Sequence, residues 1–315
     1  MLQLLLGGSG SGKTTLLYQR IRTRAEKGEK SILLVPEQFT SSTEGRIYRE
    51  LGDALSGMVE SFSFTSLAEK ILSTEGGAAV QTLSDAGRAV LVRRALEELQ
   101  DNVHYYHRHR RSAAFCQMAA QTIDELKSAG LSGRQLAQLA GACGAESGKL
   151  SELALIFQGY ETLLARSGMD PSDRLELAGA RLEEALARHS LPEFLRDRAV
   201  FIDEFDTFNA PKKRLLGAML AALPSVTVAL CDDGAPLLPG DLSLFSGAKQ
   251  VAAQLRQLAR KNGAEVAVPQ LLRKDLRHRN APGLAAVAEL LETGSCTADA
   301  PAGEVRLFAA PSREE

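Results

Sequence analysis

Short apolar runs, each followed by a segment with helical spacing, open the chain. Three leucines at residues 4–6 precede a glycine-rich loop, residues 32–35 form a second run that Pro36 ends, and a third run ends near Phe62. A helix is expected after each run, the first over about residues 14–25. The order β-α-β-α-β-α predicts a parallel sheet with right-handed crossovers.

The hydrophobic period changes at Ser84. From there to residue 189, apolar residues recur at helical spacing and predict an inserted helical subdomain, before apolar runs at 198–205 and 225–233 resume the sheet. The predicted organisation is a discontinuous α/β domain (1–83 and 190–270), a helical insertion (84–189), and a linker with the start of a further domain (271–315). A strand is expected to begin within residues 303–315, in a chain that continues beyond Glu315.

The stretch QLLLGGSGSGKTT at residues 3–15 satisfies the phosphate-loop pattern G-x-x-x-x-G-K-[ST]. Its glycines permit positive φ and let backbone N–H groups approach a phosphate chain. Lys13 is expected to reach the β and γ phosphates, and the Thr14 hydroxyl to bind Mg²⁺. The pattern predicts a site for a nucleoside triphosphate with Mg²⁺, made by Gly7, Gly8, Ser9, Gly10, Ser11, Gly12, Lys13, Thr14 and Thr15.

Acidic residues follow the run at 198–205. Asp203 has the position of a Walker B carboxylate, which would bind Mg²⁺ together with Thr14, and Glu204 beside it is placed to polarise a water molecule. Ligands of open α/β sheets lie at the carboxyl ends of the strands, so both acids are expected near the phosphate loop. Lys13, Asp203 and Glu204 are therefore the candidate catalytic residues, and an ordinary solvated turn is the alternative for the acidic pair.

Charge and cysteine content indicate which partners the protein could bind and in which cellular compartment it acts. The net charge of −2 gives no overall basic field, so any nucleic-acid site has to be a local patch. The four cysteines are far apart in sequence, which disfavours a zinc or local iron–sulfur site and is typical of reduced thiols in the cytoplasm. No apolar run reaches the length of a membrane span, and no signal peptide is recognisable.

The stretch HYYHRHRR at residues 104–111 concentrates three histidines, three arginines and two tyrosines. Such a cluster can contact phosphate or stack on a base, and a solvated loop between two helices is the alternative. Metal binding by His104, His107 and His109 has less support, because no cysteine or carboxylate completes the set.

Several segments, in order, resemble the N-terminal part of the AddB family, the B subunits of bacterial AddAB helicase–nucleases. These segments are LLLGGSGSGKTT, ILLVPEQFTSSTE, VESFSFTSLAEKIL, SDAGRAVLVRRALEEL and FIDEFDTFNAPKKRLLGAML. The resemblance implies a RecA-like P-loop NTPase sheet of the superfamily 1 helicase type, interrupted by the helical insertion. It also implies ATP as the nucleotide, a nuclease domain with an iron–sulfur cluster outside this chain, and a cytoplasmic protein of recombinational repair.

The same resemblance implies partners and DNA contacts. The partners are an AddA-like subunit, which would form a heterodimer with this protein, and single- and double-stranded DNA. The resemblance also implies that this part recognises a Chi-like sequence and does not drive translocation. Related helicases touch single-stranded DNA at positions that match Phe39, Thr40, Phe62, Ser63 and Phe64. Aromatic rings beside hydroxyls suit stacking on bases, and burial in the core is the alternative for the phenylalanines.

Two other functions remain open from the sequence. One is a self-contained P-loop ATPase or phosphotransferase, which would need an acceptor pocket and an arginine-bearing lid. The other is a scaffold whose nucleotide only stabilises the fold. Enzymatic activity of this part of the chain is left undecided by its residues.

Overall fold

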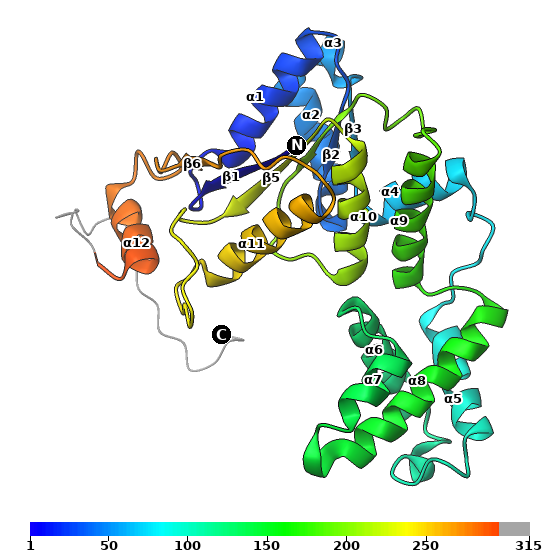
Figure 1. Ribbon diagram of the computed structural model, residues 1–315. Helices are drawn as coiled ribbons and strands as arrows, with labels where there is room; N and C mark the ends of the chain where they lie inside the picture. Colours follow the sequence, from blue (N-terminus) through cyan, green and yellow to red (C-terminus); the bar gives the residue numbers. More distant parts are fainter. Residues whose placement is uncertain (296–315) are drawn as a thin grey trace. The chain divides into compact units, whose positions relative to one another are not determined.

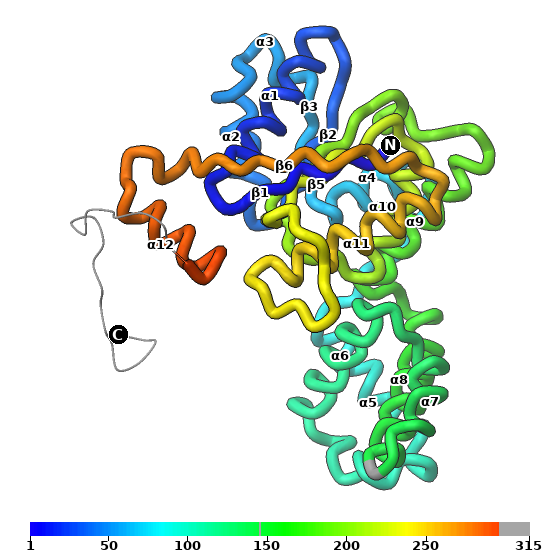
Figure 2. The backbone as a smooth tube through the Cα atoms, turned by 60° about the vertical axis from the view of Figure 1, so that its left-hand side comes forward, coloured from blue at the N-terminus to red at the C-terminus, as the bar shows by residue number. Residues whose placement is uncertain are grey.

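The structure is a computed structural model that describes residues 1–295, and these form two compact units (Figures 1 and 2). The sheet unit comprises residues 1–61, 197–207 and 223–295. The helical unit comprises residues 62–196 and 208–222.

A six-stranded parallel sheet in the order β3-β2-β4-β5-β1-β6 forms the centre of the sheet unit. The buried leucines at the start of the chain lie in β1, and β4 and β5 carry the later apolar runs. Runs this apolar suit strands that are covered on both faces. The strands are β1 (Leu2–Gly7), β2 (Ser31–Leu34), β3 (Val59–Phe62), β4 (Ala199–Ile202), β5 (Ser225–Cys231) and β6 (Gln270–Leu272).

Helices cover the sheet on both sides. In Figure 1, α1 and α2 lie on one side and α11 on the other. Leu17 and Ile21 of α1 pack with Leu5, Leu33 and Phe201 of the strands in one buried cluster. The helices of this unit are α1 (Lys13–Glu26), η1 (Glu37–Phe39, a 3-10 turn), α2 (Thr40–Leu51), α3 (Asp53–Ser56), α11 (Ser246–Lys261) and α12 (Pro282–Thr293).

The register of the strands brings their carboxyl ends to one edge. Gly7 is paired with Cys231, and Ile202 is paired with both Leu34 and Val228. The segments that follow β1, β4 and β5 therefore leave the sheet at the same edge. This edge is where ligands bind in open parallel sheets.

Serine hydroxyls cap four helices of the helical unit. Ser63, Ser84, Ser112 and Ser132 each accept a hydrogen bond from a backbone N–H in the first helical turn, which satisfies a donor that the helix itself leaves free. The helices and turns are α4 (Phe64–Glu75), α5 (Asp85–Glu98), η2 (His107–His109), α6 (Ala113–Ser128), α7 (Gly133–Ala140), η3 (Gly144–Glu146), α8 (Ser147–Ser167), α9 (Pro171–Ala187) and α10 (Ala210–Ala222).

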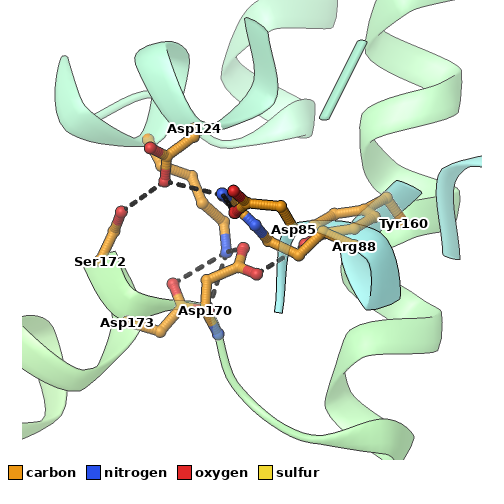
Figure 3. A network of polar contacts seen from close by, with 8 residues as sticks. Asp85, Arg88, Asp124, Tyr160, Asp170, Ser172 and Asp173 are labelled. Carbon is orange, nitrogen blue, oxygen red and sulfur yellow. Dashed lines mark hydrogen bonds and ion pairs between the residues drawn. The ribbon is translucent and has the colours of Figure 1, made fainter. Parts of the chain in front are cut away.

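A partly buried polar network links helices α5, α6, α8 and α9 (Figure 3). The ammonium of Lys127 lies 2.7 Å from the Asp170 carboxylate and 2.8 Å from that of Asp173. Asp170 is 1% exposed and also accepts the Tyr160 hydroxyl at 2.6 Å. Burial and then the bond to Asp170 raise the pKa of Tyr160, which stays a donor.

An adjoining part of the network centres on Arg88. Its guanidinium pairs with Asp85 at 2.7 Å and with Asp124 at 3.4 Å, and Asp124 also accepts the Ser172 hydroxyl at 2.8 Å. Each cation of the network pairs with a carboxylate of the same unit. Buried charges are tolerated when they are paired in this way.

The predicted α/β class with a parallel sheet is confirmed. The two units divide the chain differently from the expected segmentation. Residues 62–83 and 190–196 belong to the helical unit, as does α10, which packs against α9, and residues 271–293 belong to the sheet unit. The strand expected within residues 303–315 lies outside the described residues. Among residues 1–295, no helix is both long and apolar enough to cross a membrane.

Candidate nucleotide-binding site

The glycine-rich loop connects β1 to α1. Gly10 and Gly12 have φ of +77° and +89°, where an L side chain would be strained. Helix α1 begins directly after Gly12, so its N-terminal N–H groups face the space that the loop surrounds. The residue sequence predicted both the turn and the start of this helix.

Lys13 lies across the loop. Its ammonium donates to the carbonyl oxygens of Gly7 and Gly8, both at 2.8 Å. The hydroxyl of Ser11 is buried and has no hydrogen-bond partner among the described residues. A loop with one cation, free helical N–H groups and an unsatisfied hydroxyl fits an anionic ligand such as a phosphate.

Asp203 follows β4 and lies beside α1. It is 5% exposed, its N–H donates to the Leu34 carbonyl at 3.1 Å, and its carboxylate accepts the Glu204 N–H at 3.0 Å. Burial raises its pKa, while a hydrogen bond from the Thr14 hydroxyl and the charge of Lys13 lower it. The Thr14 hydroxyl and the Asp203 carboxylate thus meet as the motifs predicted.

Glu204 has a backbone φ of +63°, which is uncommon for any residue except glycine. Such a conformation costs on the order of 1 kcal/mol and is often retained at functional sites. Burial and then the neighbouring Asp203 raise the pKa of its carboxyl group.

Lys13, Thr14, Asp203 and Glu204 line one cavity of about 490 Å³ at the carboxyl edge of the sheet, whereas Gly7, Gly8 and Ser11 line a neighbouring one. Its volume is within the range of small-molecule sites. Carboxylates and cations both face it. The lining includes Ser9, Gly10, Gly12, Lys13, Thr14, Thr15, Arg46, Asp203, Glu204, Asp206, Cys231 and Arg277.

Two arginines of this cavity were missed by the sequence motifs. Arg46 projects from α2, with its guanidinium 4.9 Å from the centre of the Tyr18 ring. Arg277 comes from the segment interpreted as a linker, and its guanidinium donates to the Ser9 hydroxyl at 3.0 Å. Leu276, the residue before Arg277, donates its backbone N–H to the Gly10 carbonyl at 3.0 Å. No local pattern marks either arginine, because tertiary contacts bring them to the loop.

The five candidate DNA contacts are divided between the two units. In the sheet unit, Phe39 is 39% exposed at the end of η1, and the Thr40 hydroxyl donates to the Glu37 carbonyl at 2.8 Å. In the helical unit, Phe62 is half-buried with its ring 6.5 Å from that of Phe194.

The other two candidates have structural contacts inside the helical unit. Ser63 is buried and caps α4, in a reciprocal pair of bonds with Ser66. Phe64 is 2% exposed, and its ring packs edge-on against Phe208 at 6.0 Å. Of the candidate rings, Phe39 is thus the one open to solvent.

Replacing Asp203 with asparagine is expected to stabilise the chain, without nucleotide or metal, by about 1 kcal/mol at neutral pH. The pKa of the Asp203 carboxyl is higher in the folded state than in the unfolded state. Between these two pKa values the folded state binds more protons, so native stability falls as pH rises through this interval. The gain should therefore shrink toward acid pH. Urea unfolding in EDTA at neutral and acid pH measures it.

Asp206→Asn is the matched control, since Asp206 is an exposed carboxylate three positions away. It should change stability little at either pH. A less stable Asp203→Asn variant at neutral pH would show that the carboxylate's hydrogen bonds outweigh the cost of its burial.

The fold and site together define a class: parallel α/β proteins with a phosphate-loop motif after the first strand and an acidic residue after a neighbouring strand. A family described as "ADDB, N-terminal" matches residues 4–288, and the chain belongs to this family. The family resemblance predicted from the motifs is confirmed.

Relatives in three bacteria are each named as the B subunit of an ATP-dependent helicase/deoxyribonuclease. The protein of Desulforudis audaxviator is 34% identical over 99% of this chain and 27% of its own length. Those of Moorella thermoacetica and Symbiobacterium thermophilum are 32% and 31% identical, over 90% and 100% of this chain and 25% and 28% of their lengths. The chain spans about a quarter of the length of these relatives.

Proposed function

We propose that this chain is the ATP- and DNA-binding N-terminal part of the B subunit of a helicase–nuclease that resects broken DNA for recombinational repair. The observation that carries the proposal is the meeting of Lys13, Thr14 and Asp203 around one cavity at the carboxyl edge of the parallel sheet. Family membership supports the reaction class, since the relatives are named as helicase/deoxyribonuclease subunits.

In this proposal the loop residues 7–15 bind the phosphates of ATP, and the fold is RecA-like. Lys13 neutralises phosphate charge, and Thr14 and Asp203 supply oxygen ligands to Mg²⁺, which prefers hard oxygen donors. Bound Mg²⁺ would supply charge neutralisation at the phosphates. Glu204 holds a water molecule next to the loop, and Arg46 and Arg277 add positive charge at the cavity.

The remaining parts of the proposal concern partners. The word "subunit" in the relatives' name supports assembly with another chain, which we propose is AddA-like. We further propose that this part takes part in recognising a Chi-like sequence in single-stranded DNA, and that it acts in the cytoplasm. Phe39 and Thr40 are the exposed or half-exposed candidates of the sheet unit for that contact.

Titration of the 315-residue chain with a fluorescent ATP analogue tests the nucleotide site. Saturable binding is expected with Mg²⁺, and the affinity should fall roughly 10-fold in EDTA, because a Mg²⁺ held by Thr14 and Asp203 would neutralise phosphate charge. ATP should compete, and AMP, which lacks the β and γ phosphates, should not. Absence of saturable binding in Mg²⁺ would overturn the proposal. Phosphate transfer from ATP to a small molecule would favour a self-contained phosphotransferase.

A further inference from the structure

A basic and aromatic loop, residues 104–111, joins α5 to α6 in the helical unit. It has three arginines, three histidines and two tyrosines, and Asp101 is the one acid within residues 100–112. The proposed nucleotide site makes no use of it.

A buried carboxylate fixes the backbone of this loop. Glu152 of α8 is 6% exposed and accepts the N–H groups of His104 at 2.7 Å, Tyr105 at 2.8 Å and Tyr106 at 3.3 Å. A carboxylate held by several backbone donors forms strong, charge-assisted hydrogen bonds. The beginning of the loop is therefore held in one conformation.

Contacts between side chains fix the rest of the loop. The rings of Tyr106 and His109 each stack on Phe115 of α6, with ring centres 5.4 Å apart in both pairs. The Arg110 guanidinium lies 2.8 Å from the His107 ring. These residues account for the loop's structure and leave the others to face solvent.

The outward set consists of His104, Tyr105, Arg108 and Arg111, all exposed. Neither Arg108 nor Arg111 forms an ion pair with any residue of the described range. Tyr105 is 57% exposed and lies over Gly148 of α8, where an added Cβ would come within 3.0 Å of its ring. This surface thus presents two guanidiniums without ion-pair partners and one aromatic ring that lies against α8.

A shallow hollow of about 420 Å³ lies next to this surface. It is lined by Gln100, Asp101, His104, His107 and Arg108. Among residues 1–295, no group of three or more His, Cys, Asp or Glu side chains is placed to hold a metal ion.

We propose that the loop binds the backbone of a single DNA strand, with Arg108 and Arg111 on phosphates and a base stacked on Tyr105. Guanidiniums bind phosphate oxygens in pairs, and an aromatic face accepts any base, so the combination suits strand binding without sequence preference. An acidic protein surface would use the arginines and leave the tyrosine ring without a role. The choice of DNA as the ligand rests on the proposed function.

The test is binding of fluorescein-labelled oligo(dT) to the full chain at a series of salt concentrations. Arg108→Ala/Arg111→Ala should lower the affinity at least 10-fold at low salt and reduce the slope of log K against log salt by about 1.4, or roughly 0.7 per lost phosphate contact. Tyr105→Ala should weaken binding roughly 10-fold with the slope unchanged, because stacking releases no counterions.

Arg93→Ala/Arg94→Ala is the matched control, since both arginines are exposed on α5 and pair with Glu97 and Glu98. It removes the same charge from the same unit and should leave the slope unchanged. Glu152→Gln keeps every cation but weakens the hold on the loop, and it should also lower affinity. Melting temperatures measured for all variants identify any that are misfolded.

Equal effects of the two arginine pairs, or no oligo(dT) binding at all, would overturn the inference. The inference would also be overturned if polyglutamate competed as strongly as DNA and Tyr105→Ala left the affinity for oligo(dT) unchanged. That result would indicate an acidic protein partner. The ATP analogue separates the two proposals. If the chain binds the ATP analogue but the loop substitutions do not change oligo(dT) binding, only the proposed function is supported. If the loop substitutions change the salt slope but no nucleotide binds, only the loop proposal is supported.

Discussion

Lys13→Ala is expected to reduce the affinity of the chain for Mg-ATP by roughly 100-fold, about the value of one charge-assisted contact to phosphate in a partly enclosed site. The ammonium already lies inside the loop, where it donates to two glycine carbonyls at 2.8 Å. Alanine removes the one lysine that lines the cavity. Fluorescence titration with an ATP analogue measures the change.

Lys30→Ala provides the control, because Lys30 is an exposed lysine of the same unit that does not line the cavity. It should bind nucleotide like the unchanged chain. Equal affinity of Lys13→Ala and Lys30→Ala would contradict a phosphate site in this loop.

Lys13→Ala in the proposed full-length subunit, assembled with the proposed AddA-like partner, separates a motor from a regulatory nucleotide site. Loss of DNA-stimulated ATP hydrolysis in the complex would indicate a working motor in this unit. Loss of nucleotide binding by this subunit with little change in hydrolysis by the complex would indicate a regulatory or structural nucleotide.

Lys127→Met is expected to destabilise the chain by about 3–5 kcal/mol, the usual cost of removing one partner from a buried ion pair. Methionine fills a similar volume but leaves the Asp170 carboxylate, 1% exposed, without its cation (Figure 3). The Tyr160 hydroxyl at 2.6 Å is one hydrogen bond and does not replace a charge. Urea unfolding followed by circular dichroism measures the loss.

Lys149→Met is the matched control, since Lys149 pairs with Glu146 at an exposed position of the same unit. Exposed pairs contribute little, so no clear change in stability is expected. Lys127→Met/Asp170→Asn should recover part of the loss, because the uncompensated charge is then absent. A double variant no more stable than Lys127→Met would show that packing, and not charge, accounts for the effect.

Much of the candidate nucleotide site could be predicted from the sequence because its signals are local. A phosphate loop needs glycines at fixed spacing, a preceding apolar strand and a following helix, and all three are continuous in residues 2–26. Asp203 was also predictable, since it directly follows a buried strand, and parallel strands end at a common edge.

The cavity's other residues depend on contacts between distant segments. Arg46 reaches the site because α2 packs beside α1, and Arg277 because the chain returns along β6 next to β1. Hydrophobic periodicity indicates which face of an element is buried but not which element it meets. The same reason explains Ser63, whose hydroxyl is a helix cap, a role that competes with the predicted DNA contact.

The α/β class, the phosphate-loop motif, the helical insertion and the family could be predicted from the residues alone, because each depends on residue types at short, regular spacing. Folding is what brings Arg46 and Arg277 to the loop, Lys127 to Asp170, and Glu152 to the basic loop at 104–111. These pairings join residues far apart in sequence, and their energies arise from burial and charge proximity, which exist only once the chain has folded.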